Sequence, residues 1–583
     1  MFIINNLKSL LRFQKKINFF LNNSEKKKFN SLILFQLLIM LLEMIGIGLI
    51  FPVLKILTDN TFLADNYYFT QIQTSFNIER DILGYILLFI LIVFIFCKNL
   101  VIVGFIYLKA KIVYDVFYNI RSKLFKNYLN QDYSFYIKKN PSNLIKHVQI
   151  ESTTFMRVFD SLISTYSEVF LLIGTAIILF IISFKITLFI MLFFLLFVIL
   201  FLRFFKKKLK NLGAERENLD SEFLSALQNG IFSFREIFFY NCKSFFINKF
   251  NFVNLKLKYN LMITSVIGQS LRVAIEQLAI VLVGTVMMIF IIFNVNITNY
   301  IPYFGVVFYS FFRILPSFNK LILNMQLFLT SQKAIDVILN EYSSIENSKN
   351  IQQEKLQQNY FEFKDSIKIE NLSYQNDENL KILNNINLII KKNEKIGIVG
   401  KTGSGKSSLL YILMGLVNFN LRGTVSIDGI NLNNIRKQWF NKIGYVSQDN
   451  LLLDYSVLEN ITYESDYSKV DKSIYEKVIS EANLKEFIED YKSRKNPKLG
   501  SKGITVSGGE SQRISLARAL YKNSEILFLD EFTSSLDSKT EKKIIENLSK
   551  INKTMIIVSH KLSSLTICDK IYEINEGNLK QVK

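Results

Sequence analysis

The chain has 583 residues, half of them hydrophobic, and a formal net charge of +21 at pH 7. That length is too great for one ordinary domain, and so apolar a composition argues against a wholly soluble protein. The apolar residues crowd before about residue 325 and thin out after it, which favours a membrane part followed by a soluble part.

The distribution of charge argues against nucleic-acid binding, the ordinary interpretation of a strongly basic chain. Residues 109–157 carry nine Lys and Arg against three acids, and residues 203–272 carry twelve against five. Residues 58–81 carry one Arg against four acids. This alternation is typical of the cytoplasmic and external loops of a membrane protein, so no nucleic-acid partner is expected.

The first 28 residues form a basic segment, with seven Lys and Arg set among Leu and Phe. We predict over 1–28 a basic amphipathic helix that lies on the inner membrane surface. A disordered basic tail is the alternative.

Six apolar stretches follow, each near the roughly 20 residues that a membrane-spanning helix needs. They predict an all-α, six-helix transmembrane domain over residues 29–339, with both of its ends in the cytoplasm. The predicted spans are residues 31–57, 82–108, 158–182, 186–205, 273–293 and 301–323.

Two long polar, helix-compatible stretches lie between spans two and three and between spans four and five. At ~1.5 Å rise per residue, helices through these stretches extend tens of Å into the cytosol. We predict turns near 131–141 and 228–238, each with a short transverse helix.

Residues 340–364 are polar and predict a linker, and the pattern then changes to short strands and helices over 365–583. Three apolar runs, 395–399, 526–529 and 554–558, are typical of buried parallel strands. The second domain is therefore predicted to be a cytosolic α/β domain.

A glycine-rich motif follows the first of these strands. Residues 400–407 read GKTGSGKS and fit GxxxxGK[ST], the phosphate-binding loop (P-loop). Backbone N–H groups of such a loop surround the β-phosphate, Lys406 would bridge the β- and γ-phosphates, and the Ser407 hydroxyl would bind Mg²⁺. The predicted ATP contacts here are Gly400, Lys401, Thr402, Gly403, Ser404, Gly405, Lys406, Ser407 and Ser408.

Two acids close the second strand. Asp530 ends the apolar run and is placed to hold Mg²⁺, and Glu531 is placed to polarise the attacking water. A strand that ends in Asp-Glu is often only a solvated loop, but the P-loop upstream makes a nucleotide site the better interpretation.

Residues 506–510, VSGGE, resemble the LSGGQ signature of ATP-binding cassette (ABC) proteins, with Val506 and Glu510 as departures. Gln448 matches the family's Q-loop, residues 535–537 match its D-loop, and His560 matches its switch histidine, all in family order. The resemblance covers residues 365–583.

The resemblance implies an ATPase in which each ATP lies between one P-loop and the signature of a second copy, so the chain is expected to act as a homodimer. It implies Gln448, Glu531 and His560 as catalytic residues, and Ser407, Gln448 and Asp530 around Mg²⁺. The signature residues implied to meet ATP are Ser507, Gly508, Gly509 and Glu510. Adenine is expected to stack on Tyr374, although Asn376 stands at the aligned position.

The transmembrane half resembles the lipid-linked oligosaccharide flippases of bacterial protein N-glycosylation. The resemblance rests on residues 312–319, on Arg272 with Glu276, and on Glu43 with Pro52. An apolar stripe of Tyr68, Ile72 and Phe76 in the first external loop also agrees with that family. The alternative is a small surface helix that caps the membrane end.

The resemblance implies that Lys98, Arg272 and Arg313 form a cationic belt for a pyrophosphate-linked headgroup. Ionisable residues inside a membrane are functional candidates by default. The alternative is that Arg272 reaches to the inner membrane boundary, while Arg313 pairs with Glu43 or Glu276.

We therefore expect an ATP-driven flippase for a lipid-linked oligosaccharide or related glycolipid in the bacterial cytoplasmic membrane, with ATP and Mg²⁺ as cofactors. A lipid A, multidrug or peptide ABC exporter is the alternative. A third interpretation is an ABC protein that regulates without pumping. The presence of Glu531 and His560 argues against it, because non-pumping members of the family often lack one of these residues.

Overall fold

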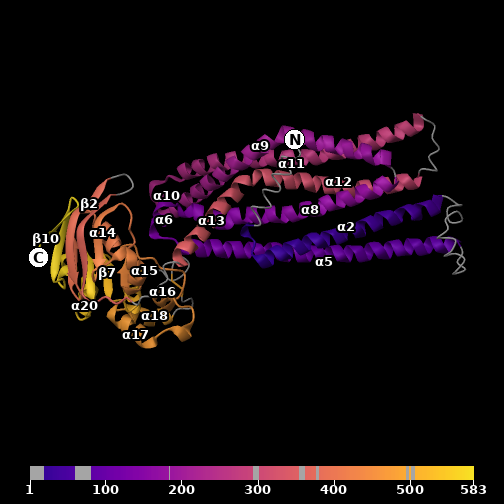
Figure 1. The fold of residues 1–583 in the computed structure, drawn as a ribbon. Coiled ribbons are helices and arrows are strands. Elements are labelled where there is room, and N and C mark those ends of the chain that lie inside the picture. Colours follow the sequence, from indigo (N-terminus) through magenta and orange to yellow (C-terminus); the bar gives the residue numbers. More distant parts are fainter. Residues whose placement is uncertain are drawn as a thin grey trace. The chain divides into compact units, whose positions relative to one another are not determined.

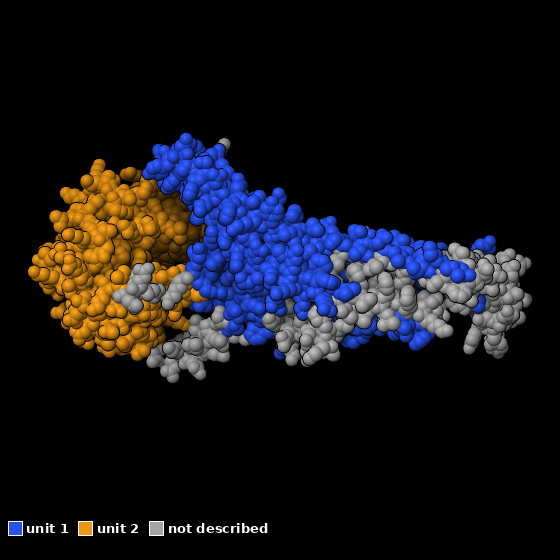
Figure 2. All heavy atoms as spheres, turned by 90° about the horizontal axis from the view of Figure 1, so that it is seen from above, with its two compact units in different colours: residues 1–131, 138–355 blue, residues 132–137, 356–583 orange. Residues whose placement is uncertain are grey.

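The computed structural model describes residues 19–58, 80–182, 184–292, 301–353, 361–375, 380–493, 498–499 and 506–583. The chain divides into two compact units (Figure 2). Unit 1 contains residues 1–131 and 138–355, and unit 2 contains residues 132–137 and 356–583. The predicted amphipathic segment up to residue 18, the predicted external stripe at 68–76 and Asn376 lie outside the described residues.

Unit 1 is helical, and its long helices run alongside one another (Figure 1). Each predicted span falls within one of them, except that residue 293 of the fifth span lies outside the described residues. They are α2 (Asn23–Thr58), α5 (Arg80–Leu129), α8 (Ser152–Ile182), α9 (Phe184–Phe232), α11 (Lys243–Ile292) and α12 (Ile301–Thr330). The stretches of α5, α9 and α11 beyond the apolar segments form the predicted long polar hairpins.

Four helices of unit 1 are long and apolar enough to cross a membrane, judged over the described residues alone. They lie within α2, α5, α8 and α12, with α8 extended at its start by residues from Pro141 onwards. The other two predicted spans belong to α9 and α11, where many side chains lie outside the description. Six spans therefore stay a prediction.

Short helices stand at both predicted turns. α6 (Tyr133–Lys138) and α7 (Pro141–Lys146) lie at the first, and α10 (Phe234–Tyr240) lies at the second. A π-helix, η1 (His147–Glu151), joins α7 to α8.

The first part of the predicted linker, residues 340–364, is helical, and the linker itself stays a prediction. Helix α13 (Gln332–Gln353) continues through it. The segment is polar, but Glu, Lys and Gln are good helix formers and it contains neither Gly nor Pro. Polarity alone does not distinguish a linker from a solvated helix.

Apolar residues three and four apart on α5 build much of the core of unit 1. Val113, Val116, Ile120 and Leu124 are all buried and pack with a cluster of buried residues from α2, α8 and α13. This spacing places them on one helix face, so the cytosolic part of α5 is held by an ordinary hydrophobic core.

Unit 2 is an α/β domain built on two sheets. The six-stranded sheet has the order β10-β9-β3-β8-β7-β6, and the four-stranded sheet has the order β2-β1-β4-β5. The larger sheet contains β3 (Lys395–Val399), β6 (Ile443–Val446), β7 (Ile526–Asp530), β8 (Thr554–Val558), β9 (Lys570–Asn575) and β10 (Asn578–Gln581). The smaller contains β1 (Ser366–Gln375), β2 (Lys381–Lys391), β4 (Leu421–Ile427) and β5 (Ile430–Asn431).

All three predicted strands are confirmed, and β6, β7, β8, β3 and β9 run parallel. Their carboxyl ends therefore meet at one edge of the sheet, where ligands bind in open α/β folds. The helices are α14 (Lys406–Leu413), α15 (Leu432–Lys442), α16 (Val457–Thr462), α17 (Lys472–Glu481), α18 (Lys485–Lys492), α19 (Gly508–Tyr521) and α20 (Ser538–Ser549).

The α6 segment belongs to unit 2 by its contacts. The ring of Tyr133 meets that of Tyr411 edge to face with their centroids 5.8 Å apart, and Arg436 lies 3.8 Å from a carboxylate oxygen of Asp132. Within the same unit, the fully buried Trp439 donates from Nε1 to the carbonyl of Leu413 at 2.9 Å. Residues 132–137 of the first hairpin thus belong to unit 2, which we also call the cassette.

Candidate nucleotide site

The P-loop turns sharply between β3 and α14 with two glycines that no other residue would replace without strain. Gly400 has φ +150°, and a Cβ there would lie 2.4 Å from the carbonyl oxygen of Ile574. Gly405 has φ +104°, and its Cβ would lie 2.8 Å from a methyl group of Leu383. The Ser404 hydroxyl is buried and has no hydrogen-bond partner among the described residues. The loop is therefore a tight cradle with an unmet polar group.

Lys406, at the start of α14, points back into this loop. Its ammonium donates to the carbonyls of Gly400 and Lys401, both at 2.8 Å. Burial lowers the pKa of Lys406, and the nearby carboxylates of Glu531 and Asp530 oppose that shift. A cation held at the mouth of a backbone cradle suits phosphate oxygens.

Asp530 ends β7 and is 3 % exposed. Burial first, and then the charge of Glu531, raise the pKa of this carboxyl to about 6, against the opposing effects of Lys406 and of the Ser407 hydroxyl. The contact with Ser407 places a hydroxyl and a carboxylate together, as the sequence predicts for Mg²⁺.

Glu531 lies between two polar side chains. Gln448 Nε2 donates to its Oε2 at 3.0 Å, and His560 Nε2 lies 3.4 Å from its Oε1. Glu531 also has a positive φ of 48°, an uncommon conformation for a residue other than Gly. Because β6, β7 and β8 are parallel neighbours, the residues that follow them converge here. We call Gln448, Glu531 and His560, the three residues predicted to be catalytic, the catalytic cluster.

The donor set fits Mg²⁺. The Ser407 hydroxyl, the Asp530 carboxylate and the Gln448 amide all offer oxygen atoms, the ligands that this hard cation prefers. One protein carboxylate is also the usual arrangement where substrate phosphates supply other ligands. The three residues predicted for Mg²⁺ thus have suitable chemistry at one sheet edge.

The signature residues begin helix α19. The Ser507 hydroxyl accepts from the backbone N–H of Glu510 at 3.2 Å, and the Glu510 carboxylate accepts from the backbone N–H of Ser507 at 2.8 Å. This reciprocal pair is a capping box. Gly509 approaches Ser535 so closely that a Cβ would lie 3.0 Å from its carbonyl. Glu510, a departure from the family motif, therefore stabilises the helix start.

Gln512 was not predicted as a site residue. Its amide donates to the carbonyl of Glu531 at 3.2 Å and to the hydroxyl of Ser534 at 2.6 Å, and it accepts from the N–H of Ser535 at 3.0 Å. This buried residue ties helix α19 to the loop after Glu531. Its position two residues after the signature is the only signal that could have indicated it.

Tyr374 lies in β1 and is 8 % exposed, with its ring edge to face against Phe419. A ring packed in the core offers little surface to an adenine. Stacking on Tyr374 therefore stays a prediction that burial does not favour.

The membrane residues are arranged differently from a free cationic belt. Lys98 donates to Glu43 at 3.1 Å, and Arg313 donates to the other oxygen of the same carboxylate at 2.5 Å. Glu43 and Lys98 are 2 % and 5 % exposed. The ion-pair alternative is thus observed for Arg313 and holds for Lys98 as well, while the side chain of Arg272 lies outside the description.

A cavity of about 340 Å³ in unit 1 is lined in part by Glu43 and Arg313. Apolar side chains such as Ile39 and Leu171 line it together with Glu43, Arg313 and Lys320. Its lining is thus amphipathic and carries both signs of charge.

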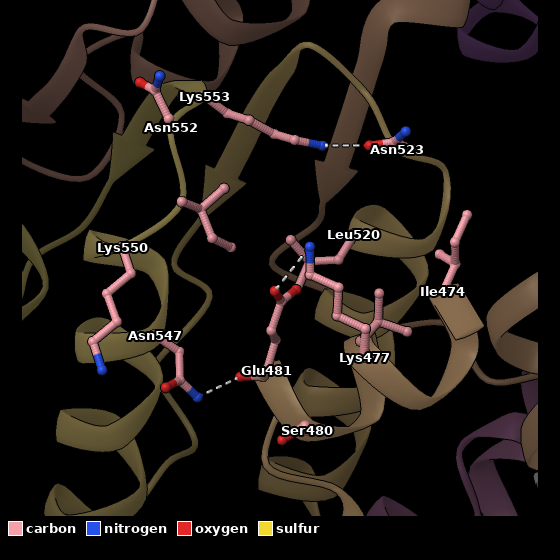
Figure 3. Close-up of a pocket in the computed structure, with 12 residues that line it drawn as sticks. Ile474, Lys477, Ser480, Glu481, Leu520, Asn523, Asn547, Lys550, Asn552 and Lys553 are labelled. Atoms are coloured by element: carbon pink, nitrogen blue, oxygen red, sulfur yellow. Dashed lines mark hydrogen bonds and ion pairs between the residues drawn. The ribbon is translucent and has the colours of Figure 1, made fainter. Parts of the chain in front are cut away.

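A cavity of about 510 Å³ in unit 2 is separate from the nucleotide site, because no predicted site residue lines it (Figure 3). Two of its three lysines have partners: Lys477 lies 3.9 Å from Glu481, and Lys553 donates to Asn523 at 3.2 Å.

Residues 383–534 match the family model described as ABC transporter. The chain is 39 % identical over 211 residues to the "Alpha-hemolysin translocation ATP-binding protein HlyB" of Escherichia coli O157:H7, a match that covers 36 % of this chain and 29 % of that protein. It is 32 % identical over 255 residues to the "ABC transporter B family member 29, chloroplastic" of Arabidopsis thaliana, covering 43 % and 39 %. The match thus spans less than half of either relative.

The fold is similar over nearly the whole chain to a solved structure, described as "Structure of a bacterial Atm1-family ABC exporter with ATP bound". The TM-score is 0.73 at 18 % sequence identity, with 94 % of this chain and 95 % of that chain covered. The chain has an ABC exporter fold. The ABC exporter fold accounts for both units, the helical one with apolar helices and the α/β one with the P-loop. The resemblance to oligosaccharide flippases in particular stays a prediction.

Proposed function

We propose that the chain is one half of a homodimeric exporter that hydrolyses ATP, with Mg²⁺, to move a substrate across the bacterial cytoplasmic membrane. The observation that supports this most is the catalytic cluster, in which Gln448 and His560 flank Glu531 at the sheet edge that carries the P-loop. An ABC protein that only regulates has no need of this arrangement.

The chain's own groups have separate roles in this proposal. The P-loop N–H groups and Lys406 bind the phosphates. Ser407 and Asp530 would hold Mg²⁺, which would supply positive charge next to the phosphate oxygens. Glu531 accepts the proton of the attacking water, and His560 orients this carboxylate.

A second copy completes the site in this proposal, because Ser507 and Gly509 would contact the ATP bound by the partner. The helix α10 supports a partner as well. Its aromatic residues Phe238, Phe239 and Tyr240 are largely exposed, and exposed aromatic patches mark interaction surfaces. Unit 2 offers a cavity of about 570 Å³ lined in part by Phe440, Tyr445 and Tyr463, which we propose receives α10 of the partner subunit.

The proposed substrate is an amphipathic anion, and a lipid-linked oligosaccharide is the leading candidate. Glu43 carries one negative charge against the positive charges of Lys98 and Arg313, so this group keeps a surplus positive charge beside the cavity. A peptide is the second candidate, because the curated relative HlyB is named for translocating a protein toxin.

ATPase activity in liposomes tests the proposal. The purified chain is reconstituted and its ATP hydrolysis is measured with polyprenyl-pyrophosphate glycans, lipid A, peptides and cationic drugs. Stimulation by the glycans, with their transfer between leaflets, is expected. Stimulation by peptides alone would replace the substrate assignment, and absence of any hydrolysis would contradict the function.

A further inference from the structure

A buried lysine lies just after the α6 segment. Lys146 is 1 % exposed. Its ammonium donates to the carbonyl of Glu217 at 2.7 Å, to the carboxylate of Glu217 at 3.0 Å and to the hydroxyl of Ser221 at 2.7 Å. The carboxylate of Glu151 lies 3.3 Å away. All three protons of the ammonium have acceptors, and both residues that accept its hydrogen bonds belong to α9.

The π-helix η1 brings Glu151 to this lysine. Residues five apart lie about 140° apart around an α-helix, so Glu151 would face away from Lys146. A π-turn closes after five residues, and η1 occupies residues 147–151, so both side chains share one face. The irregular turn thus builds the ion pair, which agrees with the frequent occurrence of π-turns at functional sites.

The lysine is also tied to α13 and α5. Glu217 forms a second ion pair with Lys333 at the start of α13. The neighbouring His147 has its Nδ1 3.1 Å from the hydroxyl of Tyr128 on α5 and 3.8 Å from the carboxylate of Glu341 on α13. The segment after α6 is therefore joined by polar contacts to three long helices of unit 1.

We infer that Lys146 is a positioning residue that couples displacement of the α6–α7 segment to α9 and α13, and so converts motion of the cassette into motion of the spanning helices. The inference rests on the proposed function. Residues 132–137 belong to the compact unit of the cassette, and the chain returns to unit 1 at residue 138. A buried charge that cannot separate from its partners makes the helices around it move together.

The test compares ATP-driven motion with ATP hydrolysis in the full-length chain. A spin label replaces Ile181, which is 80 % exposed at the end of α8, on a background without Cys97 and Cys242. In a homodimer, the distance between the two labels is measured without nucleotide and with trapped ATP. ATP hydrolysis is measured on the same preparations.

Two variants are needed because Lys146→Met leaves buried carboxylates without their cation and can fail to fold. In the double variant Lys146→Met/Glu151→Gln, Glu217 keeps Lys333 and no uncompensated carboxylate is left on η1. The matched control is Lys210→Met, which removes an exposed lysine of α9.

We expect the double variant to retain basal ATP hydrolysis and cooperative unfolding. The equilibrium constant between the two label-distance populations with trapped ATP should fall by about tenfold, within the usual range of coupling between sites. The control should shift like the parent chain. A variant whose labels shift like the parent's, or whose hydrolysis and shift fall in parallel, would overturn the inference. If the parent's own labels do not respond to ATP, the transport proposal fails, and the inference fails with it.

Discussion

His560 Nε2 lies 3.4 Å from Oε1 of Glu531, although the two residues follow different strands of the sheet. On the other oxygen, Gln448 donates at 3.0 Å. The carboxylate is therefore held from both sides, and the positive φ of Glu531 is a strained backbone conformation for a residue other than Gly. Such preorganisation is what a general base requires.

Glu531→Gln should bind ATP but hydrolyse it slower by about 10²–10⁴-fold, since the amide keeps the size of the side chain and cannot take a proton. Gln448 and His560 can still hydrogen-bond to it. Hydrolysis under single-turnover conditions, together with ATP occupancy, measures the two effects separately.

The matched variant Lys406→Ala removes a phosphate contact and should weaken ATP binding itself. If Glu531→Gln hydrolyses ATP at the parental rate, the catalytic assignment is wrong. If Glu531→Gln and Lys406→Ala weaken ATP binding equally, Glu531 does not act in hydrolysis alone as proposed.

Asp530→Asn should stabilise the nucleotide-free chain at pH 7 by roughly 1–3 kcal/mol. The pKa of Asp530 is raised to about 6, so the folded state holds the proton more tightly than the unfolded state, whose pKa is near 3.8. Folding stability from this group is present below about pH 4 and is lost as pH rises through 6. Thermal unfolding should therefore show a gain at pH 7 that vanishes near pH 4.

The same variant should lose Mg²⁺-dependent ATP hydrolysis, because it removes the carboxylate proposed to hold the metal. If Asp530→Asn and the parent chain unfold at the same temperature at both pH values, burial of the charged carboxylate does not destabilise the fold as predicted. The buried carboxylate of Asp530 thus lowers folding stability at pH 7 and is retained for its proposed role in holding Mg²⁺.

The meeting of the P-loop, Glu531 and His560 at one sheet edge could be predicted from the sequence, because these residues follow buried parallel strands. Such strands are continuous apolar runs, so residues after 399, 529 and 558 had to meet at one edge. The contacts of Gln512 could not be predicted, because they depend on how α19 packs against the loop after Glu531.

The membrane unit was predicted less completely. Its helices follow from length and hydrophobicity, but the partners of Lys98 and Arg313 depend on which helices are neighbours and how each is rotated. The π-helix at 147–151 has no local sequence signal. Helix α13 was missed because a polar helix and a polar linker have similar compositions.

Glu43→Gln should destabilise the helical unit by about 3–5 kcal/mol, since it leaves the buried Lys98 without a counter-charge. The double variant Glu43→Gln/Lys98→Met removes that unpaired charge and should recover much of the loss. Thermal unfolding of the full chain in detergent measures both variants. A Glu43→Gln chain with parental stability and lost transport would instead assign this carboxylate to the substrate.

Glu510→Gln should leave folding stability nearly unchanged and should lower the ATP concentration needed for hydrolysis. Glutamine at this position also forms a capping box, so the contact with Ser507 survives. The substitution removes a negative charge that, in the proposed homodimer, faces the phosphates bound by the partner subunit. Glu510→Ala breaks half of the cap and should cost about 0.5–2 kcal/mol.

The chain contains its own control for this prediction. Ser456 and Glu459 form a second capping box at the start of α16, outside the predicted ATP contacts. Glu459→Gln makes the same chemical change there and should alter neither stability nor the ATP requirement. If Glu510→Gln and Glu459→Gln give the same KM for ATP, the carboxylate of Glu510 does not face a nucleotide, and the proposed composite site loses its support. A KM lowered in Glu510→Gln alone, with unfolding temperatures unchanged in both, would place the signature against the partner's ATP.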